Sequence, residues 1–157
     1  MNLAEICHFV HLVPPQSDTT GLSSSCINME EWSHLTIVVL MGATNADAGF
    51  ITVQKCTSIA AANPTDFAFQ YYAEETDAGD VLDATPTRVT AATGIDAAPA
   101  GVNNIMYVIE IDAAELGQSY PFVRVTFSVP GGANLIAALG ILSGGRDARA
   151  ASPTVLT

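Results

Sequence analysis

The sequence has few charged residues, and basic residues are the scarcest of them. Charged side chains make up 13% of the 157 residues, and 16 acidic residues against five basic ones give a net charge of −11. Ordinary soluble domains carry about a quarter of their residues as charges. A strongly acidic chain repels phosphate backbones, so we expect no direct contact with nucleic acid. The low charge also predicts that much of the surface meets other protein.

Long apolar runs and a cysteine framework are missing as well. The apolar runs are far shorter than the roughly 20 residues that span a bilayer, so we expect no membrane contact. The segment Met1–Cys7 lacks the basic and apolar regions of a signal peptide, which predicts synthesis in the cytosol. An odd number of widely spaced cysteines argues against structural disulfides and predicts small buried fillers; these are Cys7, Cys26 and Cys56.

The sequence contains no recognisable catalytic motif. No Gly-x-Ser-x-Gly elbow is present, and the run Gly144–Arg146 lacks the Gly-Lys-Ser/Thr ending of a phosphate-binding loop. Serine, histidine and aspartate all occur, but no spacing selects a set of them. We therefore predict no catalytic residues, no enzymatic activity and no cofactor.

One acidic stretch, Glu74–Asp83, has the composition of a calcium loop. It has carboxylates within a short span and a glycine for a turn, but its spacing does not match an EF-hand. We favour a solvated acidic turn that discourages edge pairing, and keep as weak Ca²⁺ candidates Glu75, Asp77, Asp80 and Asp83. His8 and His11 lie near Cys7, but no second ligand pair completes a zinc site, so we predict no bound metal.

Most of the sequence consists of short apolar runs separated by small polar residues, glycine and proline. Several runs alternate in the two-residue period of a half-buried strand. The clearest are His34–Met41, Phe50–Cys56, Asp66–Tyr72, Ile105–Ile111, Tyr120–Phe127 and Asn134–Leu142. About eight strands at this spacing predict an all-β fold, a single-domain antiparallel β-sandwich or a jelly-roll-like variant of it. Asp112–Leu116 predicts one helical turn, capped by Asp112 with Glu115 three residues later.

The ends of the chain are expected to differ from its middle. Residues 1–25 predict an N-terminal strand or extended arm followed by a loop, with a short helix from Leu3 as an alternative. The apolar segment should stop at Pro14 and Pro15, which interrupt a hydrogen-bonded ladder. Residues 26–143 form the predicted sandwich core, and residues 144–157 a C-terminal tail that a partner orders. If residues 1–13 are an arm, their removal leaves the sandwich folded and weakens attachment.

The framework resembles that of small structural proteins of tailed bacteriophages that are encoded among head genes. The resemblance covers residues 9–145 and lies in His11–Pro15, Trp32–Leu40, Ile51–Cys56, Ala68–Tyr72, Tyr107–Leu116 and Tyr120–Phe127. It implies a virion protein that is assembled in the host cytoplasm and decorates or cements the capsid surface. The implied partners are the major capsid protein and further copies of the chain, as a dimer or trimer. No functional residue carries over with it.

The arms and the first strands supply the interface candidates: Phe9, His11, Val13, Trp32, Arg146 and Arg149. Two other functions stay open, a head-tail connector or tail component and a carbohydrate-binding β-sandwich module. The second needs an exposed aromatic platform, whereas the placement of the aromatics in or beside strands favours packing. The residues concerned are Trp32, Tyr71, Tyr72, Tyr107 and Tyr120.

Overall fold

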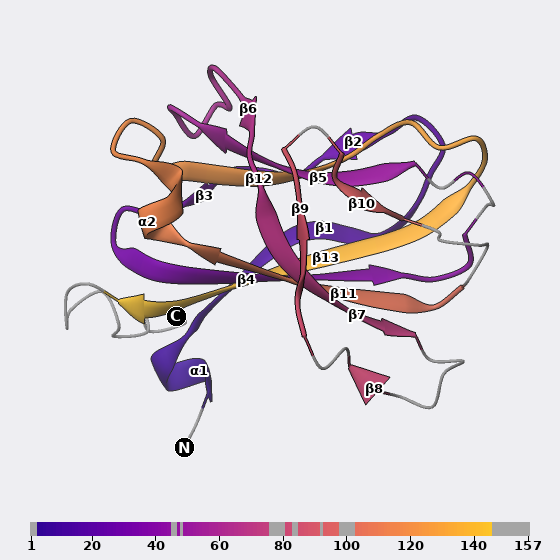
Figure 1. The fold of residues 1–157 in the computed structure, drawn as a ribbon, viewed down its shortest axis with the longest axis horizontal. Helices are drawn as coiled ribbons and strands as arrows, with labels where there is room; N and C mark the ends of the chain where they lie inside the picture. Colours follow the sequence, from indigo (N-terminus) through magenta and orange to yellow (C-terminus); the bar gives the residue numbers. More distant parts are fainter. Residues whose placement is uncertain are drawn as a thin grey trace.

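The computed structural model describes residues 3–44, 47, 49–75, 81–82, 85–91, 93–97 and 103–145. These residues form two antiparallel sheets that lie one on the other, as the ribbon in Figure 1 shows. The prediction of an all-β sandwich is confirmed. The described strands number thirteen rather than about eight, because six of them have only two or three residues.

The large sheet has seven strands, in the order β1-β13-β4-β11-β7-β8, with β9 also paired to β7. Its strands are β1 (His8–Asp18), β4 (Trp32–Met41), β7 (Phe69–Glu75), β8 (Val81–Leu82), β9 (Thr87–Val89), β11 (Ile105–Asp112) and β13 (Asn134–Gly145). Its centre is the trio β13-β4-β11, in which β4 pairs with residues 64 to 78 positions away in β11 and 95 to 113 positions away in β13.

The small sheet has six strands, in the order β10-β5-β12-β2, with β3 paired to β12 and β6 to β5. Its strands are β2 (Leu22–Ser23), β3 (Ile27–Asn28), β5 (Phe50–Cys56), β6 (Thr65–Asp66), β10 (Ile95–Asp96) and β12 (Phe122–Phe127). Only β5 and β12 are long, and the short strands extend them on either side. This sheet covers one face of the large sheet, and no other described strand lies over the opposite face.

The core lies between the sheets and follows from the two-residue period of the long strands. In β4, Leu35, Ile37, Val39 and Met41 are at most 2% exposed, and the residues between them point to the opposite face. β11 shows the same alternation from Ile105 to Ile111. Full burial of one such side chain contributes about 1.5–3 kcal/mol. The two strands therefore hold the sandwich together.

The N-terminal segment is part of this core. Of the predicted strand and arm, the structure shows a strand, and a short helix α1 (Leu3–Ile6) precedes it. The expectation that the strand stops at Pro14 and Pro15 is wrong, because β1 continues to Asp18. Among the described strands, β1 lies at the edge and pairs with β13 alone, and its register shifts across the prolines, so their missing N–H groups cost no ladder bond.

A helical turn carries the chain from the large sheet to the small one. α2 (Ala113–Leu116) follows β11 directly and precedes β12, as the sequence predicts. The backbone N–H of Asp112 donates to Oε2 of Glu115 at 3.4 Å, and Leu116 is buried beneath the turn. In the described part of the chain, no helix is long and apolar enough to cross a membrane. Beyond Gly145, the predicted tail lies outside the described residues.

Deleting residues 1–13 is expected to destabilise the sandwich rather than leave it intact. Leu12 and Val13 are 6% and 2% exposed and belong to the core, so their loss removes about 3 kcal/mol or more from the free energy of unfolding. Deleting residues 1–6 is the matched control, because Leu3 and Ile6 are half-exposed. Urea denaturation of the two truncated chains measures the difference; equal stabilities would show that β1 adds nothing to the core.

Candidate interaction surface

The side of the large sheet that faces away from the core is unusually apolar. We call this side the outer face. It presents Leu40 and Leu135 with about half of each side chain exposed, and Leu139 and Phe9 with more than a third. Leu40, Leu135 and Leu139 alternate along their strands with buried core residues. Phe9 lies opposite Ile141, which is itself on the outer face. Exposed leucines indicate an interaction site only when they form a contiguous patch.

The register shows that they are contiguous. Residues directly opposite each other in neighbouring strands lie on one face of a sheet. Leu139 is opposite Val38 on one side and His11 on the other, and Val38 is opposite Val108, which is opposite Tyr72. These five residues form one row across five strands.

Two further rows flank the central row. One is apolar and passes through Ala137, Leu40 and Met106, with Leu135 beyond it at the same end of the sheet. The other is apolar only in β1 and β13, where Phe9 is opposite Ile141, and continues through the polar residues Thr36, Glu110 and Gln70. The described outer face is therefore apolar at one end and in the middle, and polar toward its other end.

The opposite end of the outer face is polar and is organised around His34. Its Nε2 lies 2.6 Å from Oε2 of Glu110, and its Nδ1 lies 2.8 Å from Oδ1 of Asp112. The hydroxyl of Thr36 donates to the same Glu110 oxygen at 2.8 Å. Because His34 and Thr36 belong to β4 and both carboxylates to β11, this cluster joins the two central strands.

The geometry of the cluster favours the protonated ring. Burial lowers the pKa of His34, but hydrogen bonds and charges from Asp112 and Glu110 together outweigh it, so the pKa is raised above 6.5. An imidazolium donates from both ring nitrogens, which fits carboxylates on both sides. The His34 and Glu110 side chains are each one-third exposed, so water weakens the ion pair.

The same cluster is not arranged as a nucleophilic triad. Ser143 of β13 is opposite His34, so a serine, a histidine and an aspartate lie in one row. Both ring nitrogens of His34 already contact carboxylates, and neither is free to take a proton from the Ser143 hydroxyl. Within the ranges that the structure describes, no group of histidine, cysteine and acidic residues is placed to hold a metal ion.

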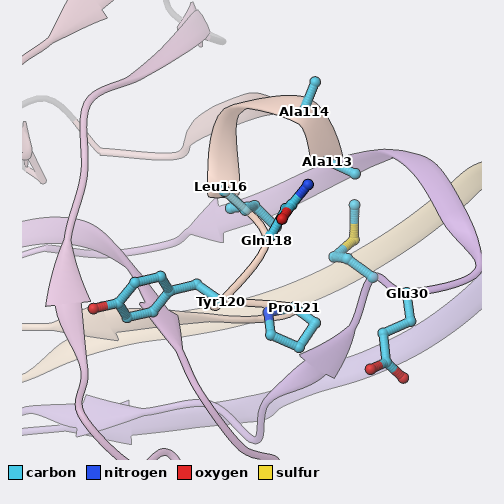
Figure 2. A pocket seen from close by; sticks show the side chains of 9 residues that line it. Glu30, Ala113, Ala114, Leu116, Gln118, Tyr120 and Pro121 are labelled. Atoms are coloured by element: carbon cyan, nitrogen blue, oxygen red, sulfur yellow. The ribbon is translucent and has the colours of Figure 1, made fainter.

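A cavity of about 380 Å³ lies beside α2, where the chain passes between the sheets. Met29, Ala113, Leu116 and Pro121 form the apolar part of its walls, Glu30 and Gln118 contribute polar groups, and Figure 2 shows Glu30 and Tyr120 on opposite sides of it. Among the described residues that line it, Glu30 supplies the one carboxylate, so no acid–base pair is present in it. The absence of enzymatic activity stays a prediction.

The predicted interface residues fall into three groups. Phe9 and His11 are exposed on the outer face. Trp32 starts β4, is half-buried against the edge of the core and stacks on His8 with ring centroids 6.0 Å apart. Val13 is 2% exposed and belongs to the core, so it cannot contact a partner while the chain is folded.

Several predicted site residues lie outside the described part of the chain. They are Arg146 and Arg149 of the tail and three of the Ca²⁺ candidates, Asp77, Asp80 and Asp83. The fourth, Glu75, ends β7, and the structure describes only its backbone.

Sequence reasoning missed the residues that define the outer face, chiefly Leu40, Leu135 and Leu139, and the cluster around His34. One signal was available for the leucines. The runs Ile37–Met41 and Leu135–Leu142 are almost continuously apolar rather than alternating. Such runs indicate strands with two apolar faces.

The chain was compared with known proteins at three levels. No family model matches it, and no curated protein matches it significantly. Among solved structures, a protein derived from the SPBc2 prophage, YomS, has a TM-score of 0.44 at 12% identity, with 88% of this chain and 96% of that one covered.

Two other solved structures are more distant. A chain from infectious bursal disease virus, strain Gx, has a TM-score of 0.36 at 13% identity and covers 88% of this chain, which spans only 32% of the viral one. A cellulose-specific carbohydrate-binding module, CBM28, has a TM-score of 0.30 at 10% identity, with 87% and 73% covered. At TM-scores below 0.5, these likenesses carry no argument about function.

The stability of the protein is expected to depend on the protonation of His34. Its folded pKa is raised above the unfolded value of 6.5, so the stabilisation is complete below pH 6.5 and is lost as the pH rises through the folded pKa. In thermal unfolding, wild type should lose its advantage over His34→Gln as the pH rises through this window. An advantage that grows with pH would contradict the assigned charge state.

Asp112→Asn is the control for the cause of the shift. It retains the shape of the side chain but removes one charge next to Nδ1 of His34. Titration of the His34 ring by NMR should give a lower pKa in this variant than in wild type. The same pKa in both proteins would mean that the carboxylate has no effect on the ring.

Proposed function

We propose that the chain is a structural protein of a tailed-bacteriophage virion that decorates or cements the capsid by binding the major capsid protein from outside. The observation that carries the proposal is the apolar outer face in a chain with few charges. The face is a surface for covering by other protein, whereas the described cavity and the polar cluster lack the groups of a reaction site.

The size of the apolar surface supports a protein-binding function. With strands about 4.8 Å apart and about 3.3 Å per residue, the apolar part of these rows extends over about 350 Å². The largest apolar patch of a typical monomer is about 300–600 Å², and such patches are often functional. Leaving leucines half-exposed here forgoes burial worth about 25 cal/mol per Å². Covering the face by protein recovers that energy.

The assignment to a tailed phage is supported by the sequence resemblance to small structural proteins of phage heads. The resembling segments lie in β1, β4, β5, β7, β11 with α2, and β12. Attachment to a shell suits the chain, because many weak contacts repeated over a lattice add up to tight binding. A net charge of −11 keeps decorated particles from adhering to one another.

Of the tyrosines that could form a carbohydrate-binding platform, Tyr72 lies on the outer face, whereas the others are packed. The carbohydrate-binding alternative needs an exposed aromatic platform, but Tyr107 is 2% exposed and packs edge-on against Tyr71 with ring centroids 5.8 Å apart. The ring of Tyr120 is covered by Lys55, whose Nζ lies 4.8 Å from its centroid. The head-tail connector and tail alternatives differ from decoration in copy number rather than in chemistry.

Quantitative mass spectrometry of virions from the phage that encodes the chain tests the proposal. A decoration protein occurs in a copy number comparable with that of the major capsid protein, and dissociation with mild denaturant should leave the shell assembled. A few copies per particle would support the connector or tail alternative. Absence from purified virions would overturn the proposal.

A further inference from the structure

We propose that the outer face binds the outer face of a second copy of this chain, so that the protein is a two-fold symmetric dimer. The inference goes beyond the proposed function: it assigns the outer face to a second copy of the chain and leaves the other surfaces of the dimer to bind the shell. It needs no capsid protein, however, and can be tested on the isolated chain.

The distribution of charge favours a second copy at this face. The whole chain has a net charge of −11, so two copies repel each other over most of their surface. The charged residues that the register places on the outer face are Glu74, Glu110, Asp112, the protonated His34 and Arg88. Their charges sum to −1, against −11 for the whole chain. Two copies can therefore approach through this face with little repulsion.

The area of the face fits a stable dimer. From Leu135 to Ser143 and across five strands, the outer face measures about 650 Å² at ordinary strand spacings. Two such faces bury about 1,300 Å² together, within the range of about 1,200–2,000 Å² for specific interfaces. Apolar residues make up about half of this area, and the rest is formed by the polar residues around His34.

The geometry is that of two sheets packed face to face. Such sheets lie about 10 Å apart with their strands about 30° from parallel, and their side chains interdigitate. A contact between identical faces is symmetric and closes at two copies. The central row, with Leu139 and Val38, lies at the middle of the contact, and the cluster around His34 lies at its margin.

A capsid protein fits the same face less well. The apolar rows are formed as soon as the sandwich folds, whereas the shell is available only during assembly. A face reserved for the shell remains in water until then, with leucines exposed to non-specific association. A second copy covers the face immediately, and the surfaces of the dimer that stay open are then available to the shell.

Sedimentation velocity of the full chain, with and without one substitution, tests the dimer. Wild type should sediment at twice the 16.3 kDa of one chain, and Leu139→Asp at 16.3 kDa, because it places a charge at the centre of the contact. Ile59→Asp is the matched control: it makes the same change on a 69%-exposed side chain of a loop of the small sheet and should remain dimeric. Leu40→Asp, on the neighbouring row, should also be monomeric.

Three results would overturn the proposal: a monomeric wild type, a trimer, or a dimer that persists in both Leu139→Asp and Leu40→Asp. Circular dichroism of each variant shows whether it is folded, and Leu40→Asp replaces a half-exposed side chain that the core does not need. The outcome is distinct from that of the virion experiment. A dimer that is absent from virions refutes only the proposed function, and an abundant virion protein that is monomeric refutes only the dimer.

Discussion

The pairing of β4 with β13 and β11 is the constraint on which the rest of the structure depends. Around Val38, Leu40 and Val108 both faces of these strands are apolar, so apolar burial there does not penalise a slip of one residue as strongly as usual. The polar cluster supplies the missing penalty. A slip would turn His34 and Glu110 toward the core, where unpaired charges are costly. In the observed register, they satisfy each other at the margin of the outer face.

This arrangement leaves the large sheet with more apolar surface than one covering layer can bury. The small sheet covers the inner side, where Ile37 and Ile109 are fully buried. The outer side keeps a continuous apolar surface that ends at charged groups. A third layer of protein would bury this apolar surface. A second copy of the chain can form that layer without bringing the net negative charges of the two chains together. The cavity beside α2 takes no part in this arrangement.

The sequence predicts those parts of the fold that local patterns determine. The runs that became β4 and β11 and the capped turn at Asp112 are examples. The course of β1 through Pro14 and Pro15 was not predictable, since it depends on β1 being an edge strand. Strands of two residues, such as β2, are too short to show a period. The outer face joins Val38 to Leu139 across a hundred residues, and no local pattern contains that register.

Isotope-filtered NMR on a mixture of labelled and unlabelled chains tests the central claim most directly, because it detects only methyl groups that touch across two copies. The account predicts intermolecular contacts at the methyl groups of Val38, Leu40 and Leu139. It predicts none at Ile59 or Val129, which are more exposed but lie away from the large sheet. Intermolecular contacts confined to such other residues, or none at any methyl group, would contradict the account.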